Sequence, residues 1–297
     1  MSLLPIRIVV PCFERPHALR RTLPSLLRQP VAEIVVVDDG SREPLAGPVR
    51  EIAGDDRRLS VLRLPRNRGS AAARNAGAET ATAGFVLFGD DDVVLAPDYV
   101  ATLHAHLLAQ GAGVAAGRRL WLAPGEAIDE ARARCRRRVD PSALVDCRRF
   151  VYDDEADFEH DLPAPLVGAT MLVRRELLRE VSYDESLYRR GGFREETDFQ
   201  VQARRAGARL LACPHALAFH LSKRELGRAG GQRKGRLLAY EWSVLRNDAA
   251  FRRKHFAALR DELGFRPGPT PWLGALRAYL GFRVPSKVRH LLGRDGP

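Results

Sequence analysis

Short, wholly apolar runs separated by polar turns dominate the first third of the chain. Ile6–Val10 is rich in β-branched residues, and Ile34–Val37 repeats the pattern. Uninterrupted apolar runs of this length are typical of parallel strands buried on both faces. The same reasoning predicts further strands in five segments: Leu59–Leu64, Phe85–Phe88, Gly113–Leu122, Ala169–Val173 and Arg209–Phe219.

Helical spacing appears between these runs. Pro16 suits the first turn of a helix, and leucines then recur at helical intervals from Leu19 to Leu27. A long basic helix or helix pair is expected from about Gln232 to Leu263. Other expected helical segments are Ser70–Ala81, Pro97–Gln110, Asp129–Arg138, Arg174–Glu180, Glu195–Arg205, Trp272–Leu280 and Val288–Leu292.

Strands and helices therefore alternate along most of the chain. This order predicts an α/β fold with a doubly wound, Rossmann-like and mostly parallel sheet flanked by helices. The chain also predicts a basic helical C-terminal extension. The expected division is a main domain over residues 1–225, with a first half at 1–122 and a second half at 123–225, followed by the extension at 226–297.

Polar residues follow the ends of the predicted strands. Ligands bind at the carboxyl ends of strands in such sheets, so these residues should face one crevice. They are Cys12-Phe13-Glu14, Asp38-Asp39, Asn67-Arg68-Gly69 and Asp90-Asp91-Asp92.

The triple aspartate Asp90-Asp91-Asp92 is the most informative of these clusters. Three neighbouring carboxylates repel one another unless a cation lies between them. Mg²⁺ and Mn²⁺ prefer oxygen ligands and also bind phosphate oxygens, which indicates a divalent metal site at the strand end. An exposed turn is the alternative interpretation.

With these residues in view, the chain resembles a family 2 glycosyltransferase with the GT-A fold. The resemblance covers roughly residues 5–220 and implies an inverting enzyme with a nucleotide-diphospho-sugar donor. Its motifs are Ile8-Val9-Val10-Pro11-Cys12-Phe13, Val36-Val37-Asp38-Asp39-Gly40-Ser41, Asn67-Arg68-Gly69 with Ala73-Arg74-Asn75-Ala76-Gly77, Gly89-Asp90-Asp91-Asp92 with Pro97-Asp98, and Gly192-Phe193-Arg194-Glu195-Glu196-Thr197-Asp198-Phe199.

The resemblance assigns roles on the donor side. Pro11 and Phe13 are expected to line the base and ribose pocket, and Asp39 to accept hydrogen bonds from base or ribose, although a turn-capping carboxylate is the alternative for Asp39. Asp92 is expected to coordinate the metal directly. The remaining donor-binding candidates are Glu14, Arg74 near the diphosphate, Asp90 towards ribose or sugar, and Asp91; for Arg74 the alternative is a plain surface arginine.

On the acceptor side the resemblance makes Glu196 the general base, where the family usually has Asp. Glu195 and Asp198 are its rivals, and all three also fit the acidic start of a helix, which the helix dipole favours. His220 is expected to complete the metal site, with a structural role as the alternative and His215 as a weaker candidate. Trp121 and Trp242 can stack on sugar rings or serve as core aromatics.

Net charge and cysteine content change this picture little. The chain has a formal net charge of +11 and a sequence pI near 10.1, but no nucleic-acid module is recognisable, so no nucleic-acid partner is expected. Cys12, Cys135, Cys147 and Cys213 fit neither a metal-ligand spacing nor a dense disulfide framework. No stretch is apolar enough to span a membrane and no secretory signal is evident, so the expected location is the cytoplasm. The basic extension is expected to lie on an anionic membrane surface, to pack as a solvated helical module, or to form a homodimer contact.

Two other functions compete with the glycosyltransferase interpretation. A sugar-nucleotidyltransferase needs a glycine-rich loop after the first strand to hold a triphosphate, and Pro11-Cys12-Phe13-Glu14-Arg15 has no glycine. A non-catalytic basic binding protein is the other. The acceptor hydroxyl can belong to a saccharide, a lipid-linked saccharide or a natural product, and the donor sugar and base stay open.

Overall fold

The computed structural model describes residues 2–135, 138–188, 192–222, 226 and 237–283. Its strands are β1 Leu4–Cys12, β2 Val31–Asp38, β3 Leu59–Arg63, β4 Phe85–Phe88, β5 Val93–Leu95, β6 Val114–Trp121, β7 Val145–Asp146, β8 Val151–Tyr152, β9 Leu162–Pro163, β10 Met171–Arg174 and β11 Leu210–His220. Its helices are α1 Pro16–Leu27, α2 Ala46–Ala53, α3 Ser70–Glu79, α4 Tyr99–Ala109, α5 Ile128–Arg134, α6 Glu195–Arg205, α7 Leu237–Ala257 and α8 Pro271–Ala278.

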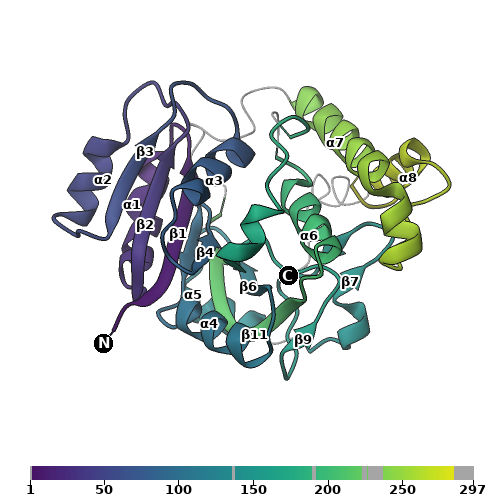
Figure 1. Cartoon of the computed structure of the whole chain (residues 1–297), viewed down its shortest axis with the longest axis horizontal. Coiled ribbons are helices and arrows are strands. Elements are labelled where there is room, and N and C mark those ends of the chain that lie inside the picture. Colours follow the sequence, from purple (N-terminus) through teal and green to yellow (C-terminus); the bar gives the residue numbers. More distant parts are fainter. Residues whose placement is uncertain (1, 136–137, 189–191, 223–225, 227–236, 284–297) are drawn as a thin grey trace.

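One large sheet organises the molecule, in the order β3-β2-β1-β4-β10-β6-β11-β5, with β9 paired to β11 (Figure 1). The first four strands in this order are parallel to one another. Strand β10 then runs antiparallel between β4 and β6, while β6 and β11 are parallel to each other. The predicted α/β architecture with a largely parallel central sheet is thus confirmed.

Both faces of the sheet are covered by helices, which explains its continuous apolar strands. On β1, Ile8 and Val10 face a core that includes residues of α1 and α4, whereas Val9 faces the core under α3 and α6. Helix α3 packs closely on this second face: a Cβ added at Gly77 would lie 2.4 Å from a methyl of Val9. Small residues in α3 therefore bring its first turn close to the carboxyl end of β1.

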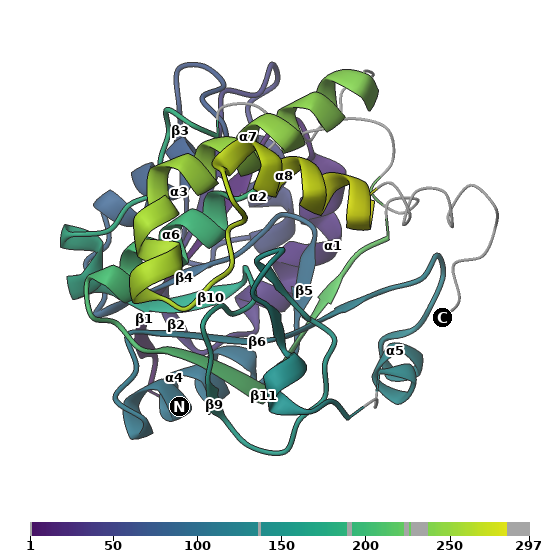
Figure 2. The same cartoon turned by 90° about the vertical axis from the view of Figure 1, so that its right-hand side faces the viewer.

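The C-terminal helices α7 and α8 pack against each other and lie over α6, far from the β3 edge (Figures 1 and 2). Asp198 of α6, fully buried, joins α6 to α7: its carboxylate accepts from His255 Nε2 at 2.6 Å and from Lys254 Nζ at 3.0 Å. Arg194 and Arg252 both donate to Asp248 on α7. Buried ion pairs therefore join the described part of the extension to the helix that begins with Glu195.

Most predicted elements match in kind, with differences in extent. The segment predicted as a helix at Arg174–Glu180 is a 3₁₀ turn over Arg175–Arg179, and the helix predicted at Asp129–Arg138 covers Ile128–Arg134. Helix α2 and the short strand β5 were not predicted. The segment Val288–Leu292 and the first residues of the predicted Gln232–Leu263 helix lie outside the described residues.

Candidate active site

The loop after β1 reaches the acidic residues that follow β4. The Arg15 guanidinium donates to Asp91 Oδ1 at 2.9 Å and to Asp92 Oδ2 at 3.1 Å. Asp91 lies deeper than Asp92, and burial, followed by repulsion from Asp92, raises the pKa of its carboxyl to about 7. Arg15 is thus a protein cation set against two members of the triple aspartate.

The predicted nucleotide-side residues are all half-buried: Phe13 and Glu14 occupy this same loop, and Pro11 lies near the end of β1, opposite Val37. Glu14 has a left-handed backbone with φ 53°, and its N–H donates to Ser41 Oγ at 2.8 Å. The loop is therefore bonded to the turn after β2. A non-glycine residue at positive φ is uncommon, and such residues gather at functional sites.

Asp39 holds the loop that leads into α3. Its two carboxylate oxygens accept the N–H groups of Arg68 and Gly69, each at 2.8 Å. Burial raises the pKa of the Asp39 carboxyl, and the two backbone hydrogen bonds oppose that shift. The structure thus shows Asp39 in a loop-capping role, and its contact with a nucleotide stays a prediction.

Arg74 lies at the centre of the site and is 3% exposed, so it is no surface arginine. It donates to Asp90 Oδ1 at 2.6 Å and to Glu195 Oε1, and its Nη2 lies 3.3 Å from Glu196 Oε1. Helix α3 thereby brings one guanidinium between the strand-end aspartate and the start of α6. The Arg74 alternative of a solvated side chain is excluded.

A single guanidinium shared by three carboxylates leaves them unequally charged. Burial would raise the pKa of Asp90, but Arg74, Arg119 and His220 together outweigh it and lower that pKa. Burial raises the pKa of Glu195 to about 8, with Arg74 opposing, and burial also raises the pKa of Glu196. The cluster thus favours an ionised Asp90 and retains a proton on the α6 side near neutral pH.

The three acidic residues of α6 differ sharply in surroundings. Glu195 is 1% exposed and also accepts from Ser70 Oγ at 2.6 Å, while Asp198 faces α7 and is fully buried. The Glu196 side chain is 25% exposed. Asp198 is therefore corrected from a rival base to a helix-packing residue, because its two oxygens are bound to His255 and Lys254 on α7.

His220 ends β11 beside the triple aspartate because β11 pairs with β5, where His220 lies opposite Val93. Its Nδ1 lies 2.8 Å from the carbonyl oxygen of Leu221, an acceptor, so Nδ1 carries the proton. Nε2, the other ring nitrogen, lies 3.4 Å from Asp92 Oδ1. An oxygen and a nitrogen donor at this separation fit one Mn²⁺ or Mg²⁺ ion.

Three residues of the candidate site were not predicted from the sequence, or only in part: Arg119, Asp154 and Trp121. Arg119 bonds to Asp154 Oδ2 at 2.7 Å and lies 3.8 Å from Asp90 Oδ2. The Trp121 indole, 45% exposed, stacks on the His220 ring with centroids 4.0 Å apart. Arg119 and Trp121 carried one signal, their position near the carboxyl end of β6, whereas Asp154 lies in an irregular acidic run after β8 that gave none.

The weaker candidates lie elsewhere. His215 is exposed and neighbours the His106 ring at 6.4 Å, and Trp242 is 60% exposed on α7 beside Trp272.

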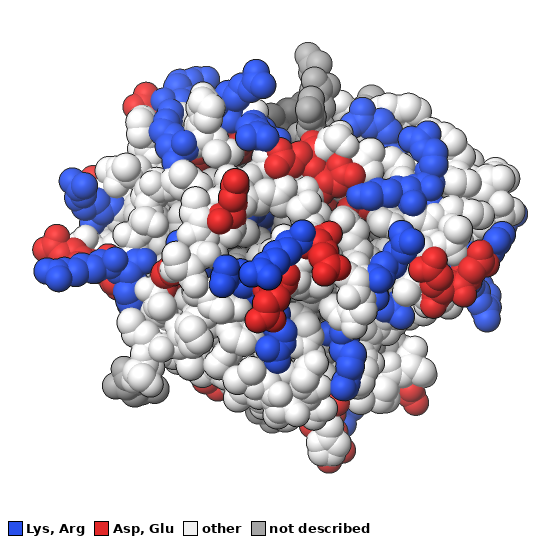
Figure 3. Space-filling view, in the orientation of Figure 1, with Lys and Arg blue, Asp and Glu red and all other residues white. Residues whose placement is uncertain are grey.

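Figure 3 shows acidic side chains gathered in the upper middle of one face, with basic side chains on both sides. That distribution suits an anionic ligand held together with a cation.

The chain is similar to known proteins in sequence and in structure. The model of the family described as glycosyl transferase family 2 matches residues 7–182. The chain belongs to glycosyl transferase family 2. Among curated family members, an N-acetylglucosaminyltransferase of Mesorhizobium japonicum is 36% identical over 118 residues, which cover 38% of this chain and 28% of that protein. The pre-mycofactocin glycosyltransferase of Mycobacterium tuberculosis is 27% identical over 226 residues, covering 74% of this chain and 43% of that one.

Solved structures show the same GT-A fold. S. aureus TarS in complex with UDP-GlcNAc aligns with a TM-score of 0.58 and 18% identity over 94% of this chain and 81% of that chain. GalNAc-T7 with UDP, GalNAc and Mn²⁺ aligns with a TM-score of 0.61 and 18% identity over 97% of this chain and 58% of that chain. The matched regions span only 28% and 64% of the length of the first two curated relatives.

Proposed function

We propose that this family 2 member is a metal-dependent, inverting glycosyltransferase that moves a sugar from a nucleoside diphosphate onto an acceptor hydroxyl. The observation that carries the proposal is the placement of two groups at one end of the sheet: Asp92 beside His220, and Glu196 beside the buried Arg74, which also binds Asp90. Asp92 and His220 offer a cation site, and Glu196 offers a partly exposed carboxylate. Of the acidic residues of α6, Glu195 and Asp198 are buried, and Glu196 is the partly exposed one.

The metal-holding residues are Asp92 and His220. A bound Mn²⁺ or Mg²⁺ neutralises charge on the departing nucleoside diphosphate. The imidazole is prepared for this role because Nδ1 is bonded to the Leu221 carbonyl, which directs Nε2 towards Asp92. Mn²⁺ in the GalNAc-T7 structure supports the choice of ion.

Glu196 acts as the general base in this proposal. Its carboxylate takes the proton of the acceptor hydroxyl while that oxygen bonds to the anomeric carbon. The bond from that carbon to the diphosphate oxygen breaks on the opposite face, so configuration inverts. Burial raises the pKa of Glu196, which brings it closer to neutral pH, and a base works best when its pKa lies near the working pH.

Residues 1–122 form the donor half in this proposal, and residues 123–225 the acceptor half. Pro11, Phe13, Glu14 and Asp39 lie on the nucleotide side, and Arg74 and Asp90 near the diphosphate and sugar. UDP-GlcNAc is the first donor to test, because several relatives are named N-acetylglucosaminyltransferases and TarS holds this compound. A saccharide, lipid-linked saccharide or natural product serves as acceptor.

The extension carries an exposed apolar surface that favours contact with a membrane. Among the described helices, none combines the length and apolar character needed to cross a bilayer. Exposed basic side chains adjoin the patch, as expected for a surface that lies on anionic lipid at the inner face of a membrane. The patch comprises Trp242, Trp272, Leu273, Leu276 and Leu280, with Arg246 and Arg277 beside it.

Vesicle sedimentation tests this contact. Wild type should bind vesicles that contain phosphatidylglycerol and bind pure phosphatidylcholine weakly, and Trp272→Glu should lose the binding. A concentration-dependent dimer that Trp272→Glu dissolves, with no vesicle binding, would assign the patch to a homodimer instead.

The decisive experiment for the activity is a panel of nucleotide sugars incubated with Mn²⁺ and read by release of nucleoside diphosphate. Wild type should hydrolyse at least one donor slowly, and Asp92→Ala should not. A pyrophosphate product from a nucleoside triphosphate and a sugar phosphate would identify a nucleotidyltransferase. Heparin or vesicle binding that survives Asp92→Ala, with no donor hydrolysed, would identify a non-catalytic binding protein.

A further inference from the structure

Three side chains of metal-binding type meet at a second place in the fold, distinct from the candidate active site. They are His106 on α4, Asp161 just before β9, and Cys213 on β11, and one donor atom from each lies within 4.8 Å of the others. On β11, Cys213 lies opposite Gly117 of β6 and His220 lies opposite Trp121, four residues further along, so the two places are roughly 13 Å apart along the sheet. We propose that these three residues bind a structural Zn²⁺ ion.

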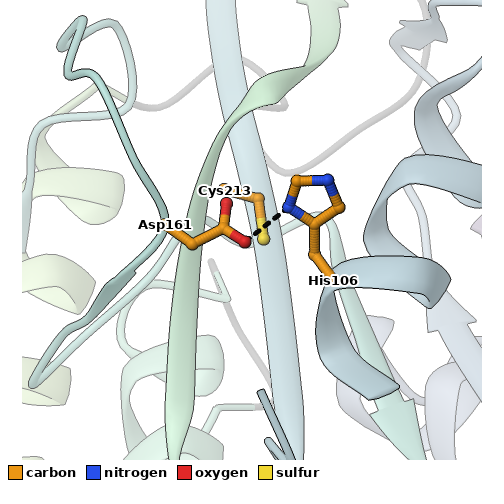
Figure 4. A group of neighbouring side chains, drawn as sticks. All are labelled: His106, Asp161 and Cys213. Atoms are coloured by element: carbon orange, nitrogen blue, oxygen red, sulfur yellow. Dashed lines mark hydrogen bonds and ion pairs between the residues drawn. The ribbon is translucent and has the colours of Figure 1, made fainter. Parts of the chain in front are cut away.

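The orientation of the ring favours a shared cation over a cysteine nucleophile. His106 Nδ1 is bonded to Asp161 Oδ2, and Figure 4 shows the Cys213 sulfur on the same side of the ring as that oxygen. Nε2 points away from both. A Cys–His–Asp catalytic group needs the imidazole between thiol and carboxylate, with one nitrogen for each. Here one nitrogen, one oxygen and one sulfur face a common point, as ligands of one ion do.

The Asp161 carboxylate has a buried oxygen that is not satisfied by a hydrogen bond from the described part of the chain. Asp161 is about nine-tenths buried, with its side chain 10% exposed, and its Oδ1 has no hydrogen-bond partner among the described residues. A buried polar oxygen without a partner is costly, and the group needs an explanation. A divalent ion would satisfy the oxygen and displace the thiol proton to solvent.

The donor set selects the ion. Thiolate and imidazole prefer Zn²⁺, whereas the oxygen-rich Asp92 and His220 site suits Mn²⁺ or Mg²⁺. His215 lies in a three-residue irregularity of β11, between Cys213 and Leu217, and its ring is 6.4 Å from that of His106. His215 or a water molecule completes four ligands. The ion would then tie α4, the segment before β9 and β11 together.

The test uses the full chain, stripped of metal and titrated with Zn²⁺ and with Co²⁺. Wild type should bind Zn²⁺ tightly with about one ion per chain at this site, raise its Tm, and show a sulfur-to-cobalt charge-transfer band with Co²⁺. Cys213→Ser should abolish the band, and His106→Gln should weaken Zn²⁺ binding by roughly 100-fold or more, beyond the usual effect of an outer-shell change.

Matched variants separate this site from others. Cys147→Ser removes a different half-buried thiol, and His160→Gln changes the exposed neighbour of Asp161; both should keep the band and the Tm shift. Asp92→Ala should keep them too, so the outcome is independent of the proposed transferase activity. The proposal is overturned if wild type shows no sulfur-to-cobalt band. It is also overturned if Cys213→Ser keeps the band and Zn²⁺ does not raise the Tm of wild type.

Discussion

Two groups of carboxylates meet at the same end of the sheet, and the protein neutralises them differently. Asp90, Glu195 and Glu196 surround Arg74, which is 3% exposed and belongs to the packed interior. Asp92 instead faces Arg15 and His220, whose side chains are 19% and 14% exposed. We call the carboxylates around Arg74 the inner group and those around Arg15 and His220 the outer group. The difference in exposure indicates that Arg74 is a fixed part of the fold, whereas a metal ion can replace Arg15 in the outer group.

If the inner group provides the base, Glu196→Gln should have the largest effect on activity. The amide cannot accept the acceptor proton, so we expect kcat to fall by about 10²–10⁴-fold while donor KM changes little. Steady-state kinetics with saturating Mn²⁺ measures this. Glu196→Asp, which introduces the residue that the family usually has, is the matched control and should keep much of the activity.

An unchanged kcat in Glu196→Gln would remove this residue as the base and leave Glu195 as the remaining candidate on α6. Asp198→Asn gives a useful contrast. It should lower Tm, because it weakens the buried contacts with His255 and Lys254, without a comparable loss of kcat in the protein that stays folded.

The outer group should show the next largest effect. In Asp92→Asn the carboxylate charge is lost, so Mn²⁺ binding weakens and transfer falls by about 10²–10³-fold. The Tm rise of wild type with UDP and Mn²⁺ should disappear in the variant. His220→Gln should reproduce part of the loss. Full activity of Asp92→Asn without added metal would show that no cation acts at this position.

The sequence predicted the inner and outer groups unequally well. Apolar runs and strand-end acids were enough to predict the sheet and the places of Asp90 and Asp92 after β4, because these depend on local pattern and on the general topology of α/β sheets. It could not predict that Arg74 is buried, since its partners lie on α6, more than a hundred residues along the chain. Arg119, Asp154 and the Cys213 cluster depend on such long-range contacts too.

The pH dependence of stability tests the inner group through the difference between wild type and Glu195→Gln, because Asp91 also keeps a proton in part of this range. With a folded pKa of about 8 and an ordinary value of 4.5, Glu195 keeps its proton in the folded protein over a range where the unfolded chain has lost it. The folded state then binds more protons, so the free energy of unfolding should fall as pH rises from about 4.5 to about 8. Glu195→Gln should reduce this fall by a few kcal/mol.

Urea denaturation of the metal-free protein at several pH values gives this slope. Glu180→Gln, a change at an exposed glutamate, is the control and should leave the slope as in wild type. A slope of opposite sign in wild type, with stability rising through this window, would mean that Arg74 keeps Glu195 ionised and that the proton resides elsewhere.

The smallest expected effect distinguishes a replaceable cation from a fixed one. Arg15 is bonded to Asp91 and Asp92, so it competes with a metal ion for the same oxygens. Because partly exposed ion pairs are worth about 1 kcal/mol or less, Arg15→Gln should tighten Mn²⁺ binding in the absence of nucleotide by roughly 2–5-fold, as measured by calorimetry. Arg20→Gln, on the exposed side of α1, should change nothing. If Arg15→Gln instead weakens Mn²⁺ binding, Arg15 supports the carboxylates as Arg74 does, and the two cations play the same structural part.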